Sequence, residues 1–371
     1  ASHGRSAKII RPVVSLEHGY DSPEFAQNLR SVARELRAKE HLVEAAARKA
    51  VAAQRSFERR YLKAGLDTMQ YARERHIPLV LLCGQLHVLH EKGVNAGIPQ
   101  LLRLNGAMAI PIDAYPVDSS PDMPSIYWAD ANRTCRAARD ARQRGDVFPL
   151  LLNSFACGPA AMVEGVFAEI LDDYPHTVLE TDGHGGSAGY VTRVQAFMHT
   201  VRQFVKEGTK NGINRAADRL GEDVPDVELR RDTRYVLFSI SDKLMPIIAA
   251  SYRSLGYDVV AAPPATARTL SLGKSDCSGK ECLPYQIIWG SFRQYMEDNP
   301  PGKPTVLMQV GGESPCRNGM FRVKDRISLA KLDRPDMSIG RFKPFTSAFY
   351  ATKLWAGFVA WDIIKAFYAY H

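Results

Sequence analysis

The 371-residue sequence predicts an α/β protein in which parallel sheets are flanked by helices and arranged in two lobes. Short apolar runs alternate with helical segments over most of the chain, and this alternation is typical of βαβ units. The alternation stops at a charged, turn-prone stretch, residues 212–231, and then begins again. The interruption favours two α/β domains joined by a linker.

The chain before the first apolar run reads as helical. Residues 22–76 are rich in Ala, Arg, Glu and Leu, and apolar residues such as Val43, Ala47 and Val51 recur every three or four positions. This spacing predicts two helices, the second of them long. The expected organisation is a helical segment at 1–76, a first α/β domain at 77–211, a linker at 212–231 and a second α/β domain at 232–371.

The strands and helices of the two domains follow from the same alternation. In the first domain the runs PLVLL, AMAIPI, VFPLLL and HTVLE predict strands, with helices expected at 98–104, 126–144, 159–171 and 187–210. In the second domain the runs RYVLFSI, YDVVAA and PTVLMQV predict strands, with helices near 243–254, 284–297 and 347–368.

Bulk properties exclude some classes of function. The formal charge of +8 is compatible with a phosphate-bearing or acyl-CoA ligand or an acidic partner, but no nucleic-acid-reading motif accompanies it, so nucleic-acid binding is not expected. The longest apolar runs are far shorter than the roughly 18 to 20 residues of a membrane span, and no signal-peptide pattern is found. We therefore expect a cytoplasmic protein without a membrane segment.

Three of the six cysteines share one sequence context. Cys157 and Cys316 each follow a predicted strand, and Cys157 and Cys282 each stand two residues before a proline that favours a helix start. Ligands of open α/β sheets bind at the carboxyl ends of strands, and a helix N-terminus favours the thiolate that binds iron or zinc. One interpretation is therefore that the three cysteines share a metal site. The other is that they are small buried side chains.

The other candidate groups are less specific. We expect Cys83 and Cys135 to be core or incidental residues. Cys277 could be either an extra metal ligand or a thiol that binds nothing. The chain has no CxxC pair for a structural zinc site, so widely separated cysteines better suit an iron–sulfur cluster. Asp182 and His184 could bind metal or move a proton, although Asp182 could equally cap the helix expected from residue 187.

Several stretches resemble the superfamily of 2-hydroxyacyl-CoA dehydratases and activase-associated proteins, which includes benzoyl-CoA-reductase-like and double-cubane-cluster proteins. The likeness is greatest to the region that follows the ATPase domains in fused activases. The similar stretches are GQLHVLHEKGVNAGIPQLLRLNG, LLNSFACGPAAMVEGVFAEIL, DGHGGSAGYVTRVQAF, KECLPYQIIWG and MQVGGESPCRNGMF. Gln85 stands where the family commonly has arginine, and the phosphate-binding signatures of the ATPase domains are absent.

The resemblance implies flavodoxin-like or Rossmann-like sheets that hold a 4Fe-4S or double-cubane iron–sulfur cluster. Carried over by position, Cys157, Cys282 and Cys316 match cluster cysteines. Arg317, beside Cys316, could contact a cluster sulfur or an acyl-CoA phosphate, or it could be an ordinary surface arginine. The implied function is low-potential electron transfer in anaerobic metabolism, driven by an ATP-hydrolysing activator and serving an acyl-CoA substrate, in a homodimer. The alternative is a non-catalytic module that docks a partner dehydratase or ATPase.

Overall fold

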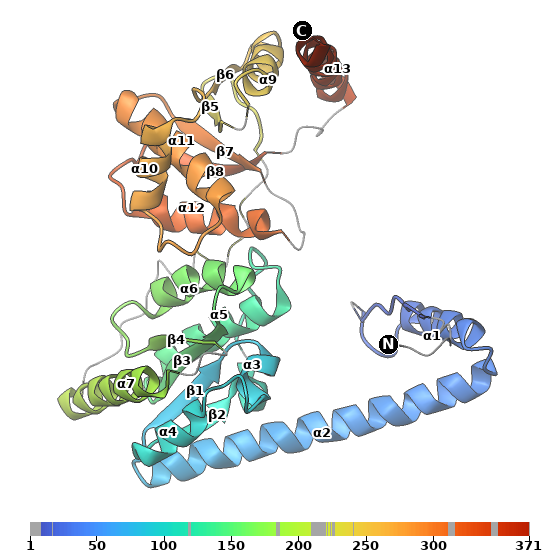
Figure 1. The fold of residues 1–371 in the computed structure, drawn as a ribbon, viewed down its shortest axis with the longest axis vertical. Coiled ribbons are helices and arrows are strands. Elements are labelled where there is room, and N and C mark those ends of the chain that lie inside the picture. The colour runs from blue at the N-terminus through green and yellow to red at the C-terminus, as the bar shows by residue number, and fades with distance from the viewer. Residues whose placement is uncertain are drawn as a thin grey trace. The chain divides into compact units, whose positions relative to one another are not determined.

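The computed structural model describes residues 9–16, 18–117, 120–182, 186–208, 220, 222, 224, 227–239, 241–310, 316–342 and 348–370. The chain divides into two compact units, Ala1–Thr68 and Met69–His371. Figure 1 shows the helices and strands of both units. Most of the linker predicted at 212–231 lies outside the described residues.

The first unit is helical. It holds α1 (Pro23–Glu35) and most of α2 (Glu40–Glu74), which are the two helices that the sequence predicts. Ser22 caps α1, because its hydroxyl accepts a hydrogen bond from the backbone N–H of Phe25. Arg55 of α2 pairs with Asp21 at 2.6 Å, which ties the start of α1 to α2.

The first lobe of the second unit is a four-stranded parallel sheet in the order β2-β1-β3-β4. Its strands are β1 (Leu79–Cys83), β2 (Met108–Pro111), β3 (Val147–Ser154) and β4 (Thr177–Thr181). The helical elements are α3 (Leu86–His90), α4 (Ile98–Leu104), η1 (Ile112–Ala114), α5 (Ala129–Arg144), α6 (Gly158–Leu171) and α7 (Ser187–Glu207). Helices α4 and α7 contact each other, as do α5 and α6.

The second lobe repeats this topology, in the order β6-β5-β7-β8 (Figure 1). Its strands are β5 (Arg234–Leu237), β6 (Asp258–Ala261), β7 (Thr305–Val310) and β8 (Met337–Phe342). The helical elements are α9 (Leu244–Arg253), α10 (Ala267–Ser275), α11 (Leu283–Asp298), η3 (Arg317–Met320), α12 (Phe321–Ala330) and α13 (Ala348–Tyr370). The predicted α/β class with two lobes of parallel strands is confirmed.

The core explains why the strands are nearly continuous apolar runs. All five residues of β1 are buried, because helices cover a parallel sheet on both faces. One cluster of buried side chains extends from the first sheet to Trp289 and Phe292 of α11 in the second lobe. A second cluster lies around Tyr235 and Ile248. Within the described part of the chain, no helix is long and apolar enough to cross a membrane.

Candidate functional site

The strand order places a topological switch point in each sheet. The chain crosses from one side of the sheet to the other between β1 and β3 in the first lobe, and between β5 and β7 in the second. Ligands of such sheets bind in the crevice at the carboxyl ends of the switch-point strands. Cys157 follows β3 and Cys316 follows β7, so these two cysteines occupy corresponding positions in the two lobes.

Cys157 is the N-cap residue of α6, as its sequence context predicts. The preceding residue, Ala156, has φ +59°, an uncommon value for a residue with a β-carbon, and such backbone strain is concentrated at functional sites. The Cys157 thiol donates to Oε1 of Gln85, with an Sγ to Oε1 distance of 3.7 Å. The residue before Gln85 is Gly84, at φ +138°, where a β-carbon would overlap the carbonyl oxygen of Leu152. Glycine is therefore needed to bring Gln85 to Cys157.

Cys316 is the N-cap residue of η3 and is exposed. The hydroxyl of Tyr127, from the first lobe, donates to the backbone carbonyl of Cys316 at 3.0 Å. The neighbouring Arg317 lies over the first residue of α6, because a β-carbon on Gly158 would be 3.0 Å from Arg317 Nε. Helix α6 and η3 are in contact. Cys157 and Cys316 therefore lie on adjoining elements of the two lobes.

Cys282 is the N-cap residue of α11, with Pro284 in the first turn, which again matches the predicted helix start. A cavity of about 330 Å³ borders this first turn and is lined by residues at the carboxyl ends of β5 and β6. Cys277, at the other end of the same loop, is half-buried, and this burial, reinforced by the charge of Glu281, raises the pKa of its thiol to about 12. The surroundings of Cys277 therefore favour the neutral thiol.

The remaining predicted residues separate from this group. Cys83 and Cys135 are fully buried, and burial raises the pKa of both thiols. Asp182 follows β4, but the N-cap residue of α7 is Gly186, so Asp182 does not hold the capping position. His184 lies outside the described residues.

Within the described ranges, the cysteines are not grouped into a metal site. Among the residues that the structure describes, no three side chains of His, Cys, Asp or Glu are grouped so that they could hold a metal ion. Sequence reasoning also missed the ion pairs made by Lys280 and Lys324 around the Cys277–Cys282 loop. Nothing local in the sequence could identify these pairs, because their partners are distant in the chain.

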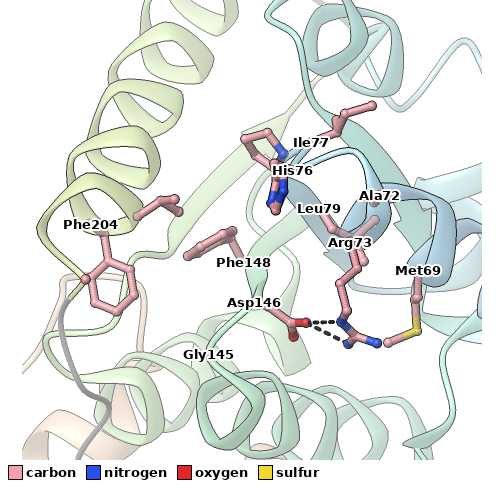
Figure 2. A pocket seen from close by; sticks show the side chains of 13 residues that line it. Met69, Ala72, Arg73, His76, Ile77, Leu79, Gly145, Asp146, Phe148 and Phe204 are labelled. Carbon is pink, nitrogen blue, oxygen red and sulfur yellow. Dashed lines mark hydrogen bonds and ion pairs between the residues drawn. The ribbon is translucent and has the colours of Figure 1, made fainter.

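A further pocket lies at the opposite end of the strands of the first sheet, where β1 and β3 begin. Its cavity volume is about 370 Å³, and its lining is largely apolar, including Met69, Phe148 and Phe204. Figure 2 shows Arg73 and Asp146 paired at its rim, with an Nη2 to Oδ2 distance of 2.6 Å. Because this pocket is at the amino ends of the strands, it is separate from the cysteine-bearing edge.

Comparison with family models gives a match over the N-terminal part of the chain. Residues 2–115 match the family described as CoA enzyme activase uncharacterised domain (DUF2229). The matched range includes α1, α2 and the strands β1 and β2, and it ends before Cys157. No curated protein and no solved structure matches the chain. The N-terminal part of the chain is thus similar to a domain that is associated with CoA enzyme activases.

Proposed function

We propose that this protein is an iron–sulfur component of a CoA enzyme activase system, in which Cys157, Cys282 and Cys316 are the cluster ligands. The observation that carries the proposal is that each of these cysteines is the N-cap residue of a helical element, and none makes a side-chain capping bond. Backbone N–H groups at such helix starts can donate hydrogen bonds to the sulfur atoms of a bound cluster, and cysteine sulfurs are the usual ligands of its iron atoms.

Two further features support this assignment. Cys157 and Cys316 follow the corresponding switch-point strands of two lobes that are in contact, which is where sheets of this topology bind ligands. The match of residues 2–115 to an activase-associated family supports the activase context. A bound cluster would supply one-electron transfer at low potential, and the partner required is an ATP-hydrolysing activator.

A docking module is the second candidate function. It is favoured by the absence, within the described residues, of a three-residue metal-binding group, and by the end of the family match before Cys157. In that case the chain would hold a partner dehydratase or ATPase and bind no iron. The chemistry of the donors fits an iron–sulfur cluster, whereas the described arrangement does not complete its coordination.

Anaerobic reconstitution with iron and sulfide separates the two functions. We expect the wild-type protein to retain iron and acid-labile sulfide after desalting. The variants Cys157→Ala, Cys282→Ala and Cys316→Ala should each lose most of the iron, because a cluster held by few thiolates does not survive the loss of one. Cys135→Ala is the matched control, since Cys135 is fully buried inside α5 and should leave the iron content unchanged.

The same measurement contains the contrary results. If the reconstituted wild-type protein retains no iron, the iron–sulfur function is wrong and the docking module is left. If all four variants retain as much iron as the wild type, a cluster is present but its ligands are other residues.

A further inference from the structure

The loop between Cys277 and Cys282 makes ion pairs with both lobes. Lys280 extends to the first lobe, where its Nζ lies 2.7 Å from Glu164 Oε2 and 3.1 Å from Glu180 Oε2. The adjacent Glu281 extends into the second lobe and pairs with Lys324 at 2.9 Å. Neighbouring residues of one short loop therefore connect two lobes.

The bonds of Glu281 within the second lobe determine the shape of the loop. The Glu281 side chain is only 1% exposed, and its carboxylate accepts hydrogen bonds from the backbone N–H and the hydroxyl of Ser278. The Glu281 carbonyl accepts a hydrogen bond from Gln286 Nε2 of α11 at 2.9 Å. Gly279, at φ +91°, makes the turn. All of these bonds join residues of the second lobe.

In the first lobe, Lys280 contacts side chains of α6 and β4. Glu164 belongs to α6, the helix that Cys157 caps, and its Oε1 accepts a hydrogen bond from Asn153 at the buried end of β3. Glu180 belongs to β4, which pairs with β3. The two carboxylates that contact Lys280 therefore belong to secondary-structure elements of the first lobe.

We propose that Lys280 is a positioning residue that holds the Cys277–Cys282 loop, and with it Cys282, against the elements that carry Cys157. The role in a cluster site rests on the proposed function, whereas the tether itself rests only on the ion pairs. The loop should detach from α6 when the two pairs are removed, and it should keep its place when another cation replaces the lysine.

The test is the alkylation rate of each cysteine in the metal-free protein, followed by mass spectrometry with iodoacetamide as the probe. In Lys280→Met we expect Cys277 and Cys282 to react about tenfold faster, because the loop spends more time detached. Lys280→Arg should restore the wild-type rates. Lys331→Met is the matched control, because Lys331 pairs with Glu169 of α6 at 3.0 Å but lies outside the loop.

The buried Cys83 and Cys135 report whether each variant is folded, since they react only when the core opens. Should Lys280→Met expose them, the double variant Glu164→Gln with Glu180→Gln removes the same pairs from the other side and must give the same acceleration at Cys277 and Cys282. Unchanged rates at these two cysteines, or equal acceleration in Lys331→Met, would overturn the proposal.

This readout is independent of iron. If the loop cysteines are accelerated but the wild-type protein takes up no iron on reconstitution, the positioning role stands and the iron–sulfur function fails. If the protein takes up iron but Lys280→Met changes neither the alkylation rates nor the iron content, the function stands and the positioning role fails.

Discussion

Gly290→Ala is expected to destabilise the protein by about 3 kcal/mol or more, the upper range for overpacking a core that cannot expand. Helices α10 and α11 cross closely, and a β-carbon on Gly290 would overlap the carbonyl oxygen of Thr269. The same crossing brings Gly273 against the backbone of Gln286. Trp289 and Phe292 are fully buried beside the crossing, so α11 has no room to move away.

Urea unfolding followed by circular dichroism measures this loss. The matched control is Gly189→Ala in α7, where a β-carbon meets nothing within 4 Å and the backbone is exposed. That variant should be more stable by about 0.5 to 1 kcal/mol, because alanine has the higher helix propensity. Equal effects of the two substitutions would show that the close crossing of α10 and α11 is wrong.

Seven of the eight strands that the structure describes, and most helices, were predictable, because the strands of a covered parallel sheet are apolar runs. Strand β8 was not predicted, because Ser338 and Arg341 interrupt its apolar pattern. The runs at β1 and β3 are continuously apolar, since both faces of these strands are covered. A helix after Cys316 was expected only without bounds, because Arg322 and Asp325 of α12, which are typical surface residues, are both buried. Helix α10 was not predicted because glycine is unfavourable inside a helix, and Gly273 lies within it. In the structure, the missing side chain of Gly273 lets α10 pack closely against α11.

The sequence predicted where individual helices of the candidate site begin. A proline two residues after Cys157 or Cys282 marks a helix beginning, because its fixed φ suits the first turn, and the structure confirms both positions. The assembly of those starts was not predictable. It depends on contacts such as Lys280 with Glu164 and Arg317 with Gly158, which join residues far apart in the chain and leave no local pattern.

Asp325→Asn is expected to remove a loss of stability that the wild-type protein suffers as the pH rises. Asp325 is fully buried between β7, α11 and α12, where Gln309 Nε2 donates to its Oδ2, while its Oδ1 has no hydrogen-bond partner among the described residues. Burial raises the pKa of this carboxyl to about 7, although the bond from Gln309 partly opposes the shift. The folded state therefore binds this proton more tightly than the unfolded state.

The sign of the effect follows from proton linkage. A carboxyl whose pKa is higher in the folded state contributes most below its ordinary pKa of 3.8, and that contribution is lost as the pH rises through about 7. The full loss corresponds to about 4 kcal/mol for a shift of about three pKa units. Asparagine has a similar shape and no charge, so the gain in stability of the variant over the wild type should be largest at about pH 8 and less than half as large at about pH 5.

Urea unfolding of both proteins at the two pH values provides the measurement, and Asp336→Asn supplies a control of opposite sign. Arg334 lowers the pKa of Asp336 by a direct hydrogen bond, so removal of that carboxylate should weaken the protein at neutral pH and cost less as the pH falls. A difference between Asp325→Asn and the wild type that is the same at both pH values would mean that Asp325 does not titrate in this range. The buried carboxyl would then be held ionised by a partner stronger than Gln309.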